Sequence, residues 1–477
     1  MGTPKFAGFT EASQNGNVLH DKSVGHYAKF VFGEGEPMPS IQQLAVAAAA
    51  LCTIVLSATA QAAPVEIQWW HAMAGKNGEL VNQFADDFNK SQGDYKVVPV
   101  FKGSYADALN AGIAAFRAGQ APAILQVFEV GTATMMAAKG AVKPVYQVMA
   151  DAGETFDPQT YLPAITGYYS TRDGKMLSFP FNSSTPVMYI NKDAFKKAGL
   201  DPNVPPKTWP EFFEDAKKLK AGGSACGFTT AWMAWSQLEV FSAWHNQPIA
   251  TDANGIGGTD AVLEINGPLQ VRHLQDLVAA AKDKSFDYAG RTTEPEAKFV
   301  SGECAMIQTS SGAYGVFKAN AKFEFGVAPL PYYPDVAGAP QNTIIGGASL
   351  WVMGGKTPAE YKGVAKFMTF LSQTPIQVQW HEVTGYLPIT KAAYAQTEKD
   401  GFYEKTPGFD VAIKELTNKP PTDNSKGLRL GNLPQIRDIV AEEVEAALNG
   451  TKTPKEALDG AVERGNVLLR AFEKTAS

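Results

Sequence analysis

Four clusters of small or polar residues follow apolar, strand-like runs, and they are the part of the sequence best suited to binding chemistry. Glu129 follows AILQVF, residues 182–184 (NSS) follow MLSFPF, residues 310–312 (SSG) follow CAMIQT, and residues 346–347 (GG) follow NTII. Serine hydroxyls and the open backbone amides beside glycine donate hydrogen bonds to anions, and a carboxylate accepts them from hydroxyls. Each cluster alone fits an ordinary turn equally well. Their recurrence after four such runs favours a ligand site.

The four clusters can act together only if a sheet brings them to one edge, and the sequence predicts such a sheet. Strand-like runs alternate with helical segments, which favours parallel α/β sheets with helices on both faces. Ligands of open α/β sheets bind beyond the carboxyl ends of the strands. Strands are predicted at residues 65–70, 95–101, 123–128, 187–190, 226–230, 304–309 and 344–352, and helices at 76–90, 105–118, 360–371 and 433–448.

The amino-terminal part of the chain has the pattern of an export signal. Residues 44–60 are almost wholly apolar, too short a run for a typical membrane span, and they end in the A-x-A pattern AQA. We predict that residues 1–62 are a leader, that Met38 is the start of the signal peptide, and that cleavage follows Ala62. No Lys or Arg lies between Met38 and the apolar run, so an uncleaved membrane anchor remains the alternative.

The bulk composition indicates a soluble, acidic globular protein. Without residues 1–62 the chain has 415 residues, enough for two or three domains. The full-length net charge is −6, and no basic stripe suggests nucleic acid. A hydrophobic content of 45% supports a packed core. Cys226 and Cys304 either pair in an exported chain or remain two buried thiols.

An exported hydrolase, such as a phosphodiesterase or a glycosidase, is the competing class. It would need a recognisable catalytic motif, and the sequence has no G-x-S-x-G elbow, no H-E-x-x-H and no Walker loop. No Cys/His spacing is typical of zinc, and we expect no cofactor and no metal. The histidines of the mature chain are scattered, at His71, His245, His273 and His381. These observations favour a binding protein.

Longer segments resemble a known family. The stretch EAKFVSGECAMIQTSSGAYG (296–315) is similar to the Phe-x-x-Gly-x-x-Ala-Met segment of the extracellular solute-binding proteins of ABC importers. The stretch YKGVAKFMTFLSQTPIQVQWHEVTGYLPIT (361–390) is similar to their late helix and Gly-Tyr-Leu-Pro segment. The resemblance covers residues 63–477, apart from Trp69, where the family more often has Phe. It is closest to the periplasmic members that bind glycerol 3-phosphate, over residues 101–145, 181–202, 342–356 and 426–437.

The resemblance implies a two-lobed α/β fold that closes on its ligand like a hinged clamp, each lobe being a mixed sheet flanked by helices. Lobe one would hold residues 63–180 and 324–374, and lobe two would hold residues 181–323 and 375–477. The family also implies a periplasmic location, a monomer, and membrane partners: the permease subunits of an ABC importer with their ATPase on the cytoplasmic side.

The resemblance further implies the ligand and the residues that hold it. The ligand would be sn-glycerol 3-phosphate, or a glycerophosphodiester such as glycerophosphocholine, captured between the lobes without chemical change. A neutral sugar of the maltose type is the alternative ligand within the binding class. The residues that match the family's ligand positions are Tyr105, Glu129, Ser184, Trp232, Ser310, Gly347, Tyr386 and Arg437.

The chemistry of glycerol 3-phosphate suggests a role for each of these residues. The phosphate needs a cation, which Arg437 supplies through its planar fork, together with several neutral donors. Glu129 should accept hydrogen bonds from the glycerol hydroxyls, because the phosphate would repel it. Trp232 would cover the C–H face of glycerol, or a choline cation. The alternatives without a ligand are a surface salt bridge for Arg437 and core packing for Trp232. If Arg437 instead binds phosphate, we expect it to face solvent in the open cleft.

Overall fold

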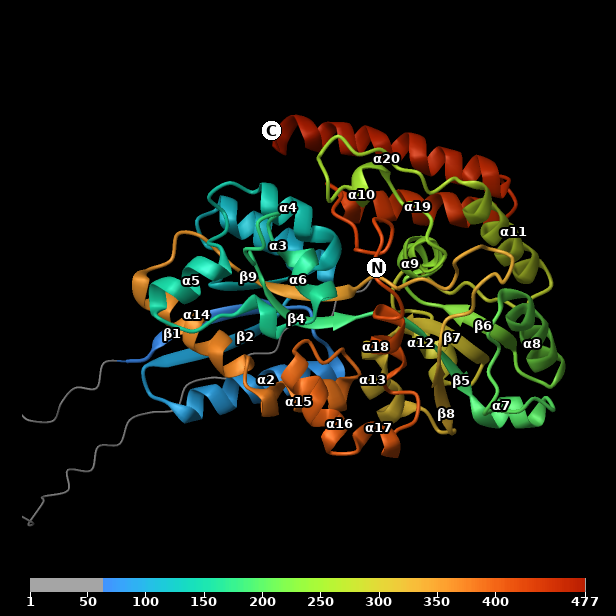
Figure 1. The fold of residues 1–477 in the computed structure, drawn as a ribbon, viewed down its shortest axis with the longest axis horizontal. Coiled ribbons are helices and arrows are strands. Elements are labelled where there is room, and N and C mark those ends of the chain that lie inside the picture. Colours follow the sequence, from blue (N-terminus) through green and yellow to red (C-terminus); the bar gives the residue numbers. More distant parts are fainter. Residues whose placement is uncertain (1–62, 477) are drawn as a thin grey trace, which may run out of the picture. The chain divides into compact units, whose positions relative to one another are not determined.

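A computed structural model describes residues 63–476 (Figure 1). The expected leader, with Met38 and the cleavage after Ala62, lies outside these residues. Among residues 63–476, none of the helices combines the length and the apolar character that a membrane span requires.

The first sheet has five strands in the order β2-β1-β3-β9-β4. Its strands are β1 (Val65–His71), β2 (Tyr95–Phe101), β3 (Ile124–Phe128), β4 (Phe179–Ser184) and β9 (Gly346–Val352). Strand β1 runs parallel to β2 and β3, whereas β9 runs antiparallel to β3 and β4. The helices packed on this sheet include α2 (Gly75–Ser91), α3 (Tyr105–Arg117), α5 (Val145–Ala152) and α14 (Pro358–Leu371). Trp69, the departure from the family pattern, is fully buried here and its ring centroid lies 5.4 Å from that of Phe367.

The second sheet has four strands in the order β6-β7-β5-β8. Its strands are β5 (Pro186–Asn191), β6 (Cys226–Thr230), β7 (Cys304–Ser310) and β8 (Phe325–Ala328). Strands β6 and β7 are parallel, and β5 is antiparallel to both β7 and β8. Helices α8 (Trp209–Ala221) and α12 (Glu296–Val300) pack on this sheet. Its core is aromatic, with the rings of Phe212 and Phe228 4.7 Å apart between centroids.

The prediction of an α/β fold with mixed sheets flanked by helices is confirmed. The chain passes from the first sheet to the second at Thr185, between β4 and β5, and returns between β8 and β9. The predicted boundary at residues 180 and 181 therefore falls inside β4. The segment 324–374, predicted for lobe one, begins with β8, which pairs with β5 in the second sheet. The assignment of residues to lobes stays a prediction.

Most of the remaining elements are short helices that connect or cover the two sheets. Helices α19 (Leu433–Leu448) and α20 (Pro454–Ala476), red in Figure 1, pack against each other. The others are α4 (Thr132–Ala137), α6 (Pro163–Tyr169), α7 (Lys192–Lys197), α9 (Val240–Trp244), α10 (Thr251–Asn254), α11 (Pro268–Lys282), α13 (Tyr314–Asn320), α15 (Thr374–Thr384), α16 (Lys391–Lys399), α17 (Phe402–Lys405) and α18 (Val411–Leu416), with short 3₁₀ or π turns at η2 (Glu129–Gly131), η3 (Pro158–Thr160), η4 (Trp235–Glu239) and η5 (Ser311–Ala313).

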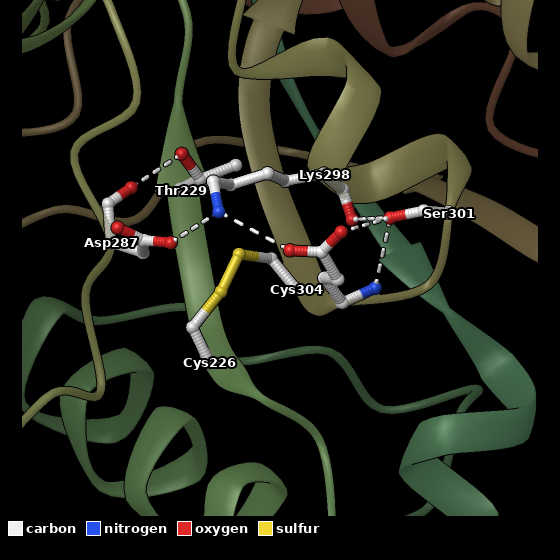
Figure 2. Close-up of a disulfide and its surroundings, with 7 residues drawn as sticks. Cys226, Thr229, Asp287, Lys298, Ser301 and Cys304 are labelled. Carbon is white, nitrogen blue, oxygen red and sulfur yellow. Dashed lines mark hydrogen bonds and ion pairs between the residues drawn. A yellow bond between two sulfur atoms is a disulfide. The ribbon is translucent and has the colours of Figure 1, made fainter.

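A disulfide joins the two parallel strands β6 and β7 (Figure 2). Cys226 and Cys304 stand opposite each other in the strand register, with Cα atoms 4.6 Å apart. Beside it, the Lys298 ammonium lies 2.8 Å from the Asp287 carboxylate. The sequence left open whether the two cysteines pair, and the structure shows that they do. The disulfide closes a loop of 78 residues, which in the chain-entropy account stabilises the fold by about 4.5 kcal/mol.

Candidate ligand-binding site

One pocket of about 670 Å³ lies where the two sheets meet. It is lined by the ends of strands from both sheets and by α19. All the residues that the sequence predicted for ligand binding contribute to its wall, namely Tyr105, Glu129, Ser184, Trp232, Ser310, Gly347, Tyr386 and Arg437.

The strand that crosses between the sheets explains why these residues meet. Ser184 ends β4 opposite Gly346 of the first sheet, and Pro186 begins β5 opposite Ser310 of the second sheet. Only Thr185 separates the two registers, so the edges of both sheets come together at this point. The sequence analysis expected the Gly-Gly cluster to follow the end of a strand. In the structure the cluster instead begins β9. Because β9 runs antiparallel to β3 and β4, its first residues still lie at the carboxyl ends of those strands.

Gly347 occupies a backbone position that only glycine fits. Its φ is +89°, and a Cβ atom built on it would lie 1.8 Å from the carbonyl oxygen of Asn182. The left-handed region is open to glycine but strained for other residues. The absence of a side chain leaves the Gly347 backbone accessible at the pocket wall.

Tyr105 is positioned by the start of α3 and by a chain of buried amides. Ser104 caps the helix, accepting a hydrogen bond from the Asp107 amide. The Tyr105 hydroxyl accepts a hydrogen bond from the Asn182 side-chain amide (2.7 Å), whose oxygen in turn accepts one from Gln126 (2.7 Å). Burial raises the pKa of Tyr105 well above its usual value, so the phenol stays protonated and can donate to a ligand.

Trp232 stands directly beyond β6 with a left-handed backbone. Its φ of +53° is rare for a bulky side chain and costs on the order of 1–3 kcal/mol. Its amide donates to the Thr292 carbonyl (2.9 Å), which fixes the turn. The Trp232 ring centroid lies 6.3 Å from that of Tyr105, and the Tyr105 ring stacks on Phe128. Trp232 is thus part of the pocket wall rather than simply of the core.

Ser310 ends β7 of the second sheet, and Tyr386 approaches it from the core of the first sheet. The Ser310 hydroxyl oxygen accepts a hydrogen bond from the Gly312 amide (3.1 Å). Gly312 also packs beneath the Tyr386 ring, which would lie 2.6 Å from a Cβ atom at that position. Tyr386 also stacks on Trp380, with ring planes 2° apart. Burial raises the pKa of Tyr386, so its hydroxyl also remains available as a donor.

Arg437, on α19, lies in a buried ion triad. Its Nε and Nη2 atoms donate to the two carboxylate oxygens of Glu239 (2.8 and 2.6 Å), and Nη2 also donates to Glu129 (2.7 Å). The side chains of Arg437, Glu239 and Glu129 are only 14%, 7% and 5% exposed. Arg437 therefore neither faces open solvent nor forms a surface salt bridge, the two arrangements that the sequence analysis had considered, and its contact with a ligand stays a prediction. Its guanidinium edge formed by Nε and Nη2 is already occupied.

Burial and charge act in opposite directions within this triad. Burial opposes the charge of Arg437, but attraction to Glu239 and Glu129 prevails and raises its pKa. For Glu129, burial prevails over the attraction of Arg437, and its pKa is raised. With all three groups ionised, the triad carries one net negative charge. Glu239 comes from the π turn η4, and nothing in the sequence spacing pointed to it.

Glu296 is a second carboxyl group that the sequence analysis missed. It begins α12, lines the pocket, and accepts a hydrogen bond from the Thr309 hydroxyl (2.9 Å) next to Ser310. Burial raises its pKa to about 7. Glu296 opens the family-like stretch quoted above, and no motif marks it as a pocket residue.

These features define a class: a protein of two α/β sheets joined by crossing segments, with a pocket between them, lined by both polar and aromatic residues, for a small solute. The chain belongs to the bacterial extracellular solute-binding protein family, whose profile matches residues 83–410. It is 56% identical over 430 residues to the sn-glycerol-3-phosphate-binding periplasmic protein UgpB of Pectobacterium atrosepticum, covering 90% of this chain and 96% of that protein. The UgpB protein of Rhizobium meliloti is 56% identical over 413 residues, covering 86% and 95%.

Solved structures of distant relatives share the fold. The structure of UgpB from Mycobacterium tuberculosis in complex with glycerophosphocholine has a TM-score of 0.72 at 22% identity, covering 85% of this chain and 99% of that one. Maltose-bound MalE3 of T. maritima has a TM-score of 0.68 at 21% identity, covering 86% and 100%. At these identities the structures establish the two-domain architecture alone.

Proposed function

We propose that this protein is the periplasmic solute-binding component of an ABC importer and that it captures sn-glycerol 3-phosphate for the permease subunits. The observation that carries the proposal is the convergence of Ser184, Ser310, Gly347, Tyr386 and Arg437 on one pocket. Relatives that are 56–57% identical over about nine-tenths of the chain bear the name of glycerol-3-phosphate-binding periplasmic proteins. The maltose-binding relatives are far more distant.

The phosphate group would be held mainly by neutral donors and one remaining edge of Arg437. The hydroxyls of Ser184, Ser310 and Tyr386 and the backbone at Gly347 line the pocket and suit a phosphate. Within residues 63–476 the Nη1 atom of Arg437 donates to no protein group, whereas Nε and Nη2 are engaged. We therefore assign the charge-assisted contact to Nη1.

The glycerol end would lie against Glu129 and the aromatic pair. Glu129 has one carboxylate oxygen on Arg437 and offers the other to glycerol hydroxyls. The rings of Tyr105 and Trp232, 6.3 Å apart between centroids, are suited to the C–H faces of a three-carbon chain. The same rings suit the cation of a choline head group, which keeps glycerophosphocholine as a second candidate ligand.

The proposed lobes would close on this ligand. By the predicted assignment, Glu129 and Gly347 belong to lobe one and Arg437 belongs to lobe two, so only a closed state makes both sets of contacts. We expect small-angle scattering to show a smaller radius of gyration with glycerol 3-phosphate than without it. An unchanged radius in a protein that starts open and binds the ligand would count against closure.

We also propose that capture involves no catalysis. The test is incubation of the purified protein with glycerol 3-phosphate, followed by phosphorus NMR of the recovered ligand and a parallel thermal melt. We expect the ligand to return unchanged and the melting temperature to rise. Release of inorganic phosphate in proportion to protein would identify a hydrolase, and the absence of any melting shift would overturn the binding proposal.

A further inference from the structure

Glu296 is a pocket carboxyl group that the proposed contacts to glycerol 3-phosphate leave unused. It stands at the first residue of α12, on the same side of the pocket as Ser310. Among residues 63–476 its one hydrogen-bond donor is the Thr309 hydroxyl (2.9 Å). Tyr386 lines the same pocket, and the charge of Glu296 contributes to its raised pKa.

No protein cation neutralises this carboxyl group among residues 63–476. Lys298, two residues further along α12, pairs instead with Asp287 and Glu303. Arg291, which also lines the pocket, pairs with Glu445. The charged group that acts on Glu296 is another acid, Glu294, and burial is the larger effect on its pKa. Glu296 is half-buried, and a carboxyl group partly removed from water without a cation favours a ligand or a proton that supplies the positive charge.

The charge balance of the whole pocket strengthens this point. Three carboxyl groups (Glu129, Glu296 and Asp438) and two guanidinium groups (Arg291 and Arg437) line it. Both guanidinium groups are already bound by carboxylates, through Glu445 for Arg291 and through Glu239 and Glu129 for Arg437. With every group ionised, these seven side chains carry a net charge of −3. In its ionised form Glu296 adds to this negative charge, and a positive charge on the ligand would offset it.

We infer that Glu296 discriminates between ligand charge classes, favouring glycerophosphodiesters whose second alcohol carries a cation over the phosphomonoester. This inference rests on the proposed function. An ionised Glu296 attracts the ammonium group of a zwitterionic diester such as glycerophosphocholine and repels the phosphate of glycerol 3-phosphate, which carries about −1.5 to −2 at neutral pH. The monoester binds when Glu296 is protonated and donates a hydrogen bond.

The test compares Glu296→Gln with the wild-type protein by titration calorimetry against both ligands at pH 7.5 or thereabouts. Glutamine keeps the shape and the acceptor for Thr309 but removes the charge. For a charge pair several Å apart in an intermediate dielectric, we expect affinity for glycerol 3-phosphate to rise about fivefold and affinity for glycerophosphocholine to fall about fivefold. Glu463→Gln, on the exposed face of α20, makes the same change in net charge and should leave both affinities unaltered.

The outcomes separate this inference from the proposed function. If the wild-type protein binds neither ligand, the proposed function fails. If it binds them but Glu296→Gln changes both affinities by the same factor, or changes neither, the role assigned to Glu296 is wrong. If Glu463→Gln reproduces the shift, the effect is one of long-range net charge and the inference is also overturned. A ratio of the two affinities that shifts only in Glu296→Gln supports it.

Discussion

Removal of Arg437 should weaken both ligand binding and the ligand-free fold. In Arg437→Ala, the Glu129 and Glu239 side chains, which are 5% and 7% exposed, lose their shared cation. Breaking a buried ion pair by deleting one partner costs about 3–5 kcal/mol, because a charge is left buried without compensation. The sequence alone suggested an arginine that faces solvent in the open cleft, and the loss of such a residue would leave the stability of the ligand-free protein nearly unchanged. The three hydrogen bonds of 2.6–2.8 Å reverse that expectation.

Denaturant unfolding without ligand measures the structural part of this effect. We expect Arg437→Ala to lose about 3–5 kcal/mol of unfolding free energy, and its affinity for glycerol 3-phosphate to fall about 10²-fold, since a hydrogen bond to a charged group contributes about 1.5–3 kcal/mol. Arg437→Lys should recover part of both, because an ammonium group cannot reproduce the planar fork.

A double variant separates the two roles. Arg437→Ala combined with Glu239→Gln removes one of the stranded charges and should regain at least about 1 kcal/mol of stability, while its affinity stays low. If Arg437→Ala unfolds at the same denaturant concentration as the wild-type protein, the triad does not hold the fold and the reasoning is refuted. If the double variant regains affinity along with stability, Arg437 acts only through structure and the phosphate contact lies elsewhere.

Three further predictions test other parts of the structure. Gly347→Ala should lose about 2 kcal/mol of stability and at least about tenfold in affinity. The new Cβ atom would clash with the Asn182 carbonyl oxygen, and the positive φ of this position is strained for alanine. A wild-type melting temperature and wild-type affinity would contradict this prediction. Replacing both Cys226 and Cys304 by Ser should cost about 4 kcal/mol, and equal stability of the two proteins in urea would show that the disulfide is dispensable. Burial lowers the pKa of His381 from 6.5 to about 4, so the unfolded state binds the extra proton and this residue alone should lower the stability by about 2 kcal/mol from pH 7 to pH 5. Burial also lowers the pKa of His71, His245 and His273, so His381→Asn should reduce the pH slope of the stability by about that amount without abolishing it, and an unaltered slope would exclude His381 as a contributor.

Much of the fold was visible in the sequence because the local patterns agree with the final structure. Periodicity predicted β6 at residues 226–230 and α19 at residues 433–448, and the structure has the same bounds. The strand-end clusters led to the pocket because carboxyl ends of strands gather at one edge. Periodicity carries no information about strand direction, however, so the antiparallel course of β9 and the pairing of β8 with the second sheet could not be deduced.

The electrostatics of the site were hidden for a different reason. Arg437 contacts Glu239 and Glu129, which lie 198 and 308 residues earlier in the chain, and only the fold brings them together. Glu296 looks like an ordinary acidic residue in the first turn of a helix, where carboxylates are common. Its proposed role depends on the absence of a nearby cation among residues 63–476, and such an absence is a property of the packed structure rather than of a sequence motif.

The most direct test of the central claim is titration calorimetry of the exported wild-type protein against sn-glycerol 3-phosphate, with maltose as the control ligand under identical conditions. We expect saturable binding of one glycerol 3-phosphate per chain and no heat of binding with maltose. Saturable binding of maltose with no response to glycerol 3-phosphate would contradict the assignment of this pocket to a phosphate ester.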